Sequence, residues 1–423
     1  MIPLPDEIVQ MIRTIEDAGF EIYAVGGCVR DSILGNQPKD WDLTSNAPRA
    51  VIEALFPDAA IVNKKLGVMR IMQGSIMADI AAYRVDGEYK DHRRPETVTF
   101  TGEIKEDLRR RDFTINAVAV SPIRGELDPH NGRSDIEKRL IRGIGDPGLR
   151  FEEDALRILR GIRFAAQLDF KVERKTLNAM KAKIHLLANI STDRIREEFL
   201  KIISAQNSGK GLALFIETGA LSHTLGEECI KNASEAEWKK LDMLAGNIDQ
   251  TQCVSETRAA LIYLCFVRER ALTSIDILKY SNEMRKRLIL AVTILDKLTE
   301  AQDKISLKRL IKELGESGYQ YLTNLKKQQC IAFELNDSAL KDQKALYESI
   351  GDKEAIFIKD LALNGSDLKK VGIHENSQMG EILEILLEMV HEYPEKNEKA
   401  ILLQTAERLK NARKRRDLSE MKA

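Results

Sequence analysis

Two aspartates near the N-terminus, Asp40 and Asp42, have the spacing of a metal site. Side chains at positions i and i+2 of a β-strand point to the same face, so both carboxylates are expected on one face of a strand. Carboxylates held this close repel each other unless a cation lies between them. Such hard oxygen ligands suit Mg²⁺, which commonly also takes substrate phosphates as ligands. A third aspartate, Asp79, falls in an otherwise apolar run, where a buried charge requires a metal or another partner.

A pair of glycines ends the apolar run that precedes these aspartates. The run at 22–25 has β-strand character and stops at Gly26-Gly27. Glycine lets the backbone approach a phosphate closely, and Arg30 can neutralise that phosphate. A lone Asp-x-Asp is commonly an exposed strand edge or a turn, but Gly-Gly-x-Val-Arg-Asp followed by Asp-x-Asp is far more restrictive. The combination favours metal binding and predicts phosphoryl or nucleotidyl transfer assisted by metal ions.

The elements that must position these residues lie in the first third of the chain. One helix and several strands are expected there: a helix over about 5–18, strands over 22–25 and around 40–43, and a hairpin of 68–72 and 76–83 around Gln73-Gly74-Ser75. After about residue 145 the strand signals fade, and apolar residues recur with the period of a helix. We therefore predict an α+β protein with a small α/β head followed by an all-helical remainder.

The composition of the 423 residues is that of a folded globular protein. Hydrophobic residues make up 43% and charged residues 31%. No apolar run reaches the roughly 18 residues of a membrane span, and the N-terminus lacks the features of a signal peptide, so we expect a cytoplasmic protein that does not bind membranes. The five scattered cysteines predict neither a zinc site nor a disulfide framework.

The charge balance limits how the chain could bind nucleic acid. The formal net charge is only −1, so such binding must come from local basic patches. The run at 408–416 is a candidate, although a solvated helix end explains it at least as well.

Four motifs together resemble a known family. They are residues 26–31, the pair Asp40 and Asp42, residues 110–117 and residues 153–157. In this order they are similar to the class II tRNA nucleotidyltransferases, the CCA-adding enzymes, and bacterial poly(A) polymerases share much of the set. The resemblance is dense over residues 20–205 and weaker beyond. It implies template-independent addition of CCA to the 3′ end of tRNA from CTP and ATP, with release of diphosphate and dependence on Mg²⁺.

The resemblance also implies four parts and a role for the first of them. These parts are a nucleotidyltransferase head at 1–145, a helical neck with the nucleotide-recognition helix at 146–207, a helical body at 208–325 and a tRNA-binding helical tail at 326–423. In the head, Asp40, Asp42 and Asp79 would be catalytic, with Asp40 and Asp42 as the metal ligands.

Four charged residues at 154–163 recur at every third position: Asp154, Arg157, Arg160 and Arg163. By themselves they favour a solvated helix face with salt bridges. The resemblance instead implies that Asp154 and Arg157 hydrogen-bond the base of the incoming nucleotide. An aspartate acceptor and an arginine donor can satisfy cytosine and adenine in turn, but leave guanine and uracil unpaired. Arg160 and Arg163 would then reach the triphosphate or the tRNA end.

The remaining nucleotide contacts are also implied by the resemblance. Gly27 and Arg30 belong to the nucleotide site, Arg111 would contact the sugar and phosphate side, and Asp112 and Asn116 would lie near the ribose. For the basic run at 109–111, to which Arg111 belongs, the alternative is a surface cluster that binds no phosphate.

One segment indicates which product the chain makes, and another departs from the family pattern. Residues 84–95 match a loop that the family needs for the final A, and its complete form favours full CCA addition. Many relatives carry His-Gly-Thr where this chain has Lys65-Leu66-Gly67-Val68, which predicts altered contacts and not lost activity.

Other functions stay open at the level of sequence. Within the same reaction class they are a poly(A) polymerase and a partial enzyme that adds only A or only CC. In another class is an RNA-binding protein that keeps the head fold without catalysis. A metal-dependent phosphohydrolase is disfavoured because no cluster of the His-Asp type accompanies the head. The sequence does not fix the oligomeric state.

Overall fold

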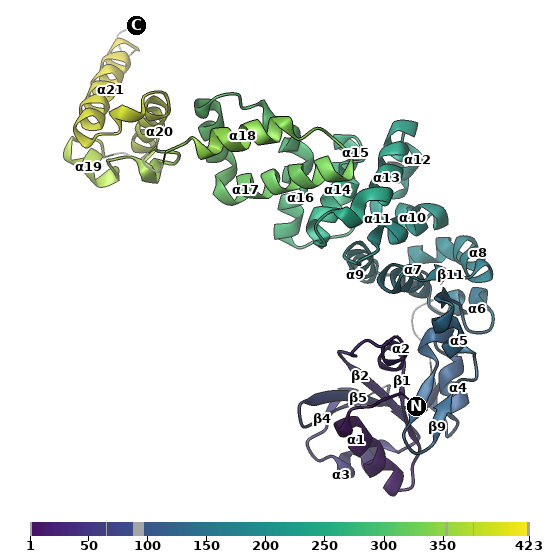
Figure 1. The fold of residues 1–423 in the computed structure, drawn as a ribbon. Helices are drawn as coiled ribbons and strands as arrows, with labels where there is room; N and C mark the ends of the chain where they lie inside the picture. The colour runs from purple at the N-terminus through teal and green to yellow at the C-terminus, as the bar shows by residue number, and fades with distance from the viewer. Residues whose placement is uncertain (1, 65, 88–96, 352–353, 375, 421–423) are drawn as a thin grey trace. The chain divides into compact units, whose positions relative to one another are not determined.

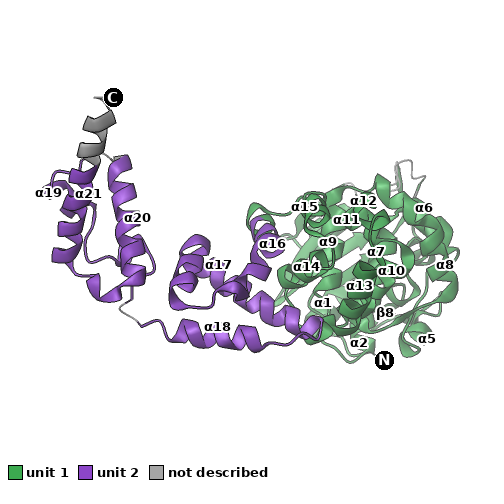
Figure 2. Cartoon of the chain, turned by 90° about the horizontal axis from the view of Figure 1, so that it is seen from above, with its two compact units in different colours: residues 1–285 green, residues 286–423 purple. Residues whose placement is uncertain are grey.

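The computed structural model describes residues 2–420 except 65, 88–96, 352–353 and 375. The chain divides into two compact units, Met1–Arg285 and Lys286–Ala423 (Figure 2). The α+β architecture expected from the sequence is confirmed, since a mixed sheet occupies the first part of the chain and helices follow it (Figure 1). The division into four parts stays a prediction.

The head is built on a seven-stranded sheet in the order β3-β4-β5-β2-β1-β8-β9. Its strands are β1 (Ile22–Val25), β2 (Trp41–Ser45), β3 (Ala60–Asn63), β4 (Val68–Gln73), β5 (Ile76–Ala82), β8 (Ala119–Ser121) and β9 (Gly125–Leu127). Only β2 and β5 run parallel, and every other neighbouring pair is antiparallel. The expected hairpin is confirmed, because Gln73 pairs with Ile76 across a two-residue turn.

One face of this sheet is covered by α1 (Asp6–Asp17) and carries the core of the head. Ile8, Met11, Ile12 and Ile15 are fully buried, which is the spacing of a single helix stripe, and α1 contacts β1, β4 and β5. Successive side chains of a strand point to opposite faces. The residues next to the buried ones on β2, β4 and β5 therefore lie on the other face, which carries the aspartates.

Short elements connect the sheet to the helical region. Two further strand pairs are β6 (Arg84–Asp86) with β7 (Val98–Phe100), and β10 (Leu140–Ile141) with β11 (Lys171–Val172). The helices of the head and its exit are α2 (Gly27–Ile33), α3 (Arg49–Leu55), α4 (Ile104–Arg109), η1 (Thr114–Asn116), α5 (Gly132–Glu137) and α6 (Pro147–Glu153). The β11 strand lies beyond residue 145, where the sequence predicted only helices.

Helices make up the remainder of the first unit. They are α7 (Leu156–Leu168), α8 (Arg174–Lys183), η2 (Ile184–Asn189), α9 (Thr192–Ile203), α10 (Ser208–Thr218), α11 (Leu221–Leu225), α12 (Glu227–Lys231), α13 (Glu235–Asn247), η3 (Ile248–Gln250), α14 (Ser255–Tyr263) and α15 (Arg268–Ile275). A buried arginine joins three of them. Arg258 on α14 is 1% exposed and donates hydrogen bonds to the carbonyls of Ile203 and Ala205, at the end of α9, and to Ser208 at the start of α10.

The second unit is also helical. After α16 (Asn282–Ile294), which contains the boundary, come η4 (Leu295–Glu300), α17 (Lys304–Ala332), α18 (Ser338–Glu348), η5 (Ile358–Asp360), α19 (Gly365–Lys370), α20 (Asn376–Glu392), η6 (Pro394–Lys396) and α21 (Lys399–Glu420). Within α17 the helix breaks at Gly315, which has a φ of 70°. Leu368, Leu386, Leu387, Val390 and Leu402 are fully buried among α19, α20 and α21. In the part of the chain that the structure describes, no helix is long and apolar enough to cross a membrane.

Candidate active site

The open face of the sheet brings two of the three predicted aspartates side by side. Asp42 on β2 and Asp79 on β5 are paired in register between parallel strands. Asp40 directly precedes β2, and it is exposed like Asp42, whereas Trp41 between them is buried. This alternation of exposure fits the predicted common face of Asp40 and Asp42, although Asp40 lies just outside the strand.

The electrostatics around Asp42 fit a bound cation. Desolvation by the surrounding protein raises the pKa of Asp42, Arg111 lowers it, and the charges of Asp79 and Asp40 raise it further. A divalent cation would relieve this repulsion, and carboxylate oxygens are suitable ligands. Among the described residues, no group of three or more His, Cys, Asp or Glu side chains could hold an ion. A cation held by Asp40 and Asp42 would thus need further ligands from water or substrate.

The sequence required a partner for Asp79, and the structure supplies an arginine. Arg70 lies opposite Asp79 in the β4–β5 hairpin and binds it through two hydrogen bonds, Nε to Oδ1 at 2.7 Å and Nη2 to Oδ2 at 2.9 Å. Arg70 was missed in the sequence analysis. The signal was present, since a hairpin that closes at Gln73 and Ile76 sets position 70 opposite position 79.

The turn at Gly26 and Gly27 lies against the carboxylate of Asp42. Gly26 has a φ of 82°, a backbone conformation that side chains disfavour. A Cβ atom at Gly26 would lie 3.3 Å from Arg111 Nη1 and 3.8 Å from Asp42 Oδ2. At the next residue, Gly27, it would lie 3.6 Å from Arg30 Nη2. The turn therefore packs closely against the two predicted arginines and Asp42, and the positive φ of Gly26 disfavours a side chain at that position.

A chain of buried polar contacts joins the head to α7. Arg30 Nη1 donates to Asn116 Oδ1 at 2.9 Å, and Asn116 Nδ2 donates to Asp112 Oδ1 at 3.1 Å. The other oxygen of Asp112 accepts Arg160 Nε at 2.8 Å and pairs with Arg160 Nη2 at 2.6 Å. Although burial opposes ionisation, Arg160 and the hydrogen bond from Asn116 lower the pKa of Asp112 to about 2. Asp112 is therefore ionised throughout the neutral range.

Three arginines of this region surround one aromatic ring. The guanidinium carbons of Arg30, Arg160 and Arg163 lie 5.3, 5.4 and 4.6 Å from the centre of the Phe164 ring. Phe164 itself is buried and packs edge-on against Phe113. The face of an aromatic ring attracts cations, so it allows several like charges to gather where an anion could bind. The sequence analysis did not identify Phe164.

Comparisons with known proteins identify the family of the chain. Residues 22–142 match the model of the poly A polymerase head domain, and residues 169–228 match that of the probable RNA and SrmB-binding site of polymerase A. The CCA-adding enzyme of Limosilactobacillus fermentum is 33% identical to the chain over 404 residues, which are 95% of this chain and 96% of the relative. The chain belongs to the CCA-adding enzyme family. The CCA-adding enzyme of Ligilactobacillus salivarius is 31% identical, over 96% of this chain and 98% of its own.

Solved structures of the CCA-adding enzyme family share the fold. The Bacillus stearothermophilus CCA-adding enzyme in complex with CTP superimposes with a TM-score of 0.75 at 24% identity, and covers 97% of this chain and 98% of its own. The Thermotoga maritima CCA-adding enzyme complexed with tRNA_CCA gives a TM-score of 0.67 at 22% identity, with 96% of this chain and 95% of its own covered.

The structure of this family member separates Asp154 from the arginines that follow it. Asp154 directly follows α6 and has an extended conformation, and α7 begins at Leu156, so Asp154 does not lie on the helix face predicted for all four residues. Its Oδ1 accepts the amide of Leu156 at 3.1 Å, which satisfies the start of α7, and its Oδ2 accepts Arg194 Nη2 at 3.2 Å. Helix periodicity alone did not reveal this break.

The arginines of α7 do not form a solvated face. Arg157 is 8% exposed, and it donates to Glu153 Oε2 at 2.6 Å and to the carbonyl of Arg110 at 2.9 Å. Arg163 Nε lies 3.0 Å from Glu198 Oε2, and both side chains are largely buried. Arg157 and Arg163 do form ion pairs, but the prediction that they lie on a solvated helix face is wrong, because both are largely buried. The structure leaves the roles in nucleotide binding as predictions.

Several predictions made from the sequence concern residues that the structure does not describe. Residues 88–95 of the predicted loop and Lys65 are not described, nor are the side chains of 413–416 in the basic run. Arg84–Asp86, the beginning of the loop segment, form β6.

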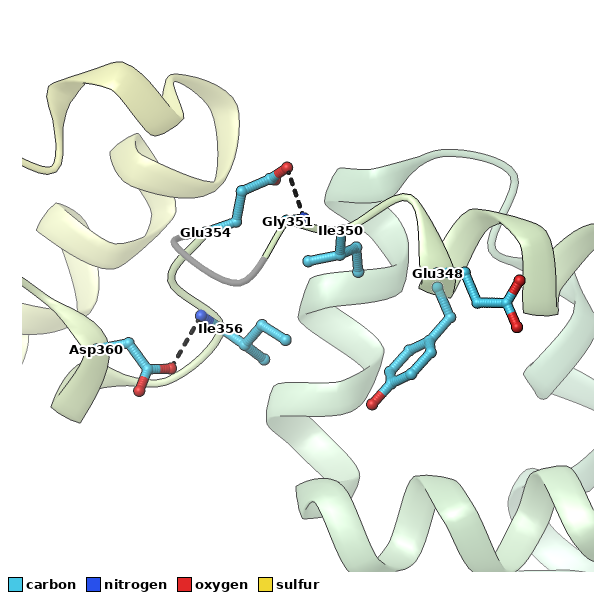
Figure 3. A pocket seen from close by; sticks show the side chains of 7 residues that line it. Glu348, Ile350, Gly351, Glu354, Ile356 and Asp360 are labelled. Atoms are coloured by element: carbon cyan, nitrogen blue, oxygen red, sulfur yellow. Dashed lines mark hydrogen bonds between the residues drawn. The ribbon is translucent and has the colours of Figure 1, made fainter.

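A hollow of about 750 Å³ in the second unit is lined by several carboxylates (Figure 3). Glu354 and Asp360 line it together with Glu348, and the first two already accept backbone amides of Gly351 and Ile356. Carboxylates disfavour a nucleotide phosphate, so this hollow does not compete with the aspartates of the sheet as the site of chemistry.

Proposed function

We propose that the chain adds CCA to the 3′ end of tRNA, using CTP and ATP and releasing diphosphate. The observation that carries this proposal is that a chain matched over almost its whole length by CCA-adding enzymes also has carboxylates in register beside a glycine turn. In the reaction, the 3′-hydroxyl of the RNA attacks the α-phosphate of the nucleotide. A bond forms between the 3′-oxygen and the α-phosphorus, the bond from the α-phosphorus to the oxygen that bridges to the β-phosphate breaks, diphosphate leaves, and the hydroxyl proton passes to solvent.

Asp40 and Asp42 would hold the metal, which we propose is Mg²⁺. A bound Mg²⁺ supplies positive charge that lowers the pKa of the attacking hydroxyl and stabilises the leaving diphosphate. Asp79 contributes negative charge beside Asp42, while Arg70 holds the Asp79 carboxylate in place.

The triphosphate has a suitable position near the arginines at Phe164. Arg30, Arg160 and Arg163 gather positive charge around this ring, and Gly27 begins the helix that carries Arg30. Bidentate contact with phosphate oxygens is the interaction that guanidinium groups favour.

The ribose and base would be held by residues at the junction of the head and α7. Arg111, Asp112 and Asn116 are proposed to contact the sugar side. Asp154 and Arg157 are proposed to select C and A, which requires Arg157 to exchange its present contact with Glu153 for the base edge.

We also propose the four-part division for the chain, with the head at 1–145, the neck at 146–207, the body at 208–325 and the tail at 326–423. The second compact unit begins at Lys286 and includes all of the proposed tail. The tail would bind the tRNA backbone through phosphate contacts, so its affinity should fall as salt rises.

The test is an extension assay with tRNA transcripts that lack the whole CCA end, that end after its first C, and that end after its second C. The chain is given CTP alone, ATP alone, or both, with Mg²⁺, and products are resolved at single-nucleotide length. We expect CC from CTP alone and CCA from the mixture. Long A tracts from ATP alone would instead establish a poly(A) polymerase, which the match to a poly A polymerase head domain keeps as a second candidate.

Two aspartate variants test the metal site. Asp42→Ala should abolish incorporation, because it removes a metal ligand. Asp17→Ala is the matched control, since Asp17 is exposed at the end of α1, outside the site. Incorporation by Asp42→Ala at the wild-type rate would refute the proposed mechanism, and a wild type that binds tRNA without extending it would establish the non-catalytic alternative.

A further inference from the structure

A fully buried carboxylate, Asp107, lies behind the candidate site. It belongs to α4 and has no solvent exposure. Its Oδ1 accepts Arg110 Nη2 at 2.6 Å and Nε at 3.1 Å, and its Oδ2 accepts Arg111 Nη2 at 3.1 Å. Burial alone would raise the pKa of Asp107, but Arg111 and Arg110 outweigh burial and lower it. One ionised carboxylate therefore holds two consecutive guanidinium groups.

Arg111 lies beside the glycine turn, close to the proposed metal ligand Asp42. While Arg111 Nη2 is held by Asp107, Arg111 Nη1 donates to the carbonyl of Asn116 at 3.4 Å and lies beside Gly26. The charge of Arg111 also lowers the pKa of Asp42. Asp107 is therefore a buried anchor that determines where the charge of Arg111 lies relative to Asp42.

Arg110 connects Asp107 to Arg157, the proposed base-selecting arginine. Arg110 Nε donates to the carbonyl of Arg84 at 3.2 Å, and the backbone amide of Arg84 donates to Asp107 Oδ1 at 3.3 Å. The carbonyl of Arg110 accepts Arg157 Nη2 at 2.9 Å. Asp107 therefore fixes the side chain of Arg110 at the start of β6, and the backbone of the same residue receives Arg157.

The neighbouring acid of α4 has no such connections. Glu106 pairs with Arg109 at 3.9 Å, and both side chains are exposed, by 44% and 71%. An exposed pair of this kind contributes little to stability. Glu106 carries the same charge on the same helix, but its ion-pair partner is the exposed Arg109, so it is a matched control for Asp107.

We propose that Asp107 is a positioning residue for nucleotide binding: it holds Arg111 beside the glycine turn near Asp42 and, through Arg110, fixes the carbonyl that receives Arg157. The assignment rests on the proposed nucleotidyl transfer at that site. Asp107 itself touches no reacting atom. Its effect on catalysis passes through Arg111 and Arg157, the two arginines of the proposed nucleotide site.

The test compares Asp107→Asn with Glu106→Gln and wild type. Titration calorimetry with CTP and with ATP, in the presence of Mg²⁺, gives nucleotide affinity without turnover, and steady-state extension of truncated tRNA gives kcat and KM for each substrate. We expect Asp107→Asn to weaken binding of both nucleotides and to lower kcat/KM on the order of 100-fold. Its KM for tRNA and all parameters of Glu106→Gln should match wild type.

Combination with Arg111→Ala separates positioning from a general structural role. If Asp107 acts through Arg111, the double variant should lose less nucleotide affinity than the product of the two single losses. Multiplicative losses, or equal weakening of tRNA binding in Asp107→Asn, would show a structural role and overturn the proposal.

Two further outcomes are decisive. If Asp107→Asn does not fold, Asp107→Glu keeps the charge but moves the carboxylate by one methylene, and wild-type CTP affinity in that variant would overturn the proposal. A wild type that adds no nucleotide would refute the proposed function alone, because the calorimetric comparison of Asp107→Asn with Glu106→Gln still measures the effect of Asp107 on nucleotide binding.

Discussion

Replacement of Asp112 by asparagine should destabilise the first unit by a calculable amount. Asparagine resembles the neutral form of the carboxyl in shape, and the folded protein lowers the pKa of Asp112 from 3.8 to about 2. This shift corresponds to roughly 2 kcal/mol in favour of the ionised form. Asp112→Asn also turns an amide donor toward Arg160, so roughly 2 kcal/mol is the minimum expected loss.

Urea unfolding followed by circular dichroism at neutral pH measures this loss. The control is Glu126→Gln, because Glu126 pairs with Arg133 at the surface, where both side chains are about one third exposed. That change should cost no more than about 1 kcal/mol. A loss in Asp112→Asn as small as that of the control would refute the view that the contact with Arg160 is strong.

The dependence on pH gives a second check. Because the pKa of Asp112 is lower in the folded protein than its ordinary value of 3.8, the unfolded chain binds the proton more tightly. The stabilisation by the carboxylate is therefore complete above about pH 4 and is lost as the pH falls toward about 2. The difference between wild type and Asp112→Asn should stay constant from pH 7 to pH 5, and a decline within that range would contradict the assigned pKa.

Three other changes have defined outcomes. Arg70→Ala leaves Asp79 without its cation, so the Mg²⁺ concentration for half-maximal incorporation should fall about two- to fivefold, and an unchanged or higher requirement would contradict the charge argument. Gly26→Ala should lose about 1–2 kcal/mol to its left-handed backbone and also nucleotide affinity, whereas Gly19→Ala, with a φ of 88° and no atom near its Cβ, should show only the backbone cost in urea unfolding. Arg258→Met should cost about 2–4 kcal/mol in the same measurement, because carbonyls at the end of α9 lose their donor, and a neutral result would show that water replaces it.

The strand pattern and the hairpin were predictable because local rules determine them. Alternation of apolar residues located β4 and β5, and the turn at Gly74 set their register. The parallel pairing of β2 with β5 was not predictable in this way, because it joins segments separated by the β3–β4 region and depends on the packing of the whole sheet.

The candidate site was predicted in its residue types but not in its contacts. Asp42, Asp79 and Arg111 were identified from motifs, whereas Asp107 resembles any other acid of a short helix in sequence. Only the tertiary structure buries it and leaves Glu106 exposed on the same helix. The break before α7 was missed for a similar reason, since Asp154 continues the three-residue spacing while its backbone leaves the helix.

The row formed by Arg70, Asp79 and Asp42 across three strands makes activity a reporter of correct folding. Sliding β5 by one residue past β2 would turn Asp79 toward the apolar face under α1 and set an apolar residue beside Asp42. Such a molecule would have a charge in its core and an incomplete site at once. Variants that weaken the sheet should therefore reduce the fraction of active molecules while leaving the turnover rate of each active molecule unchanged, a distinction that active-site titration can make.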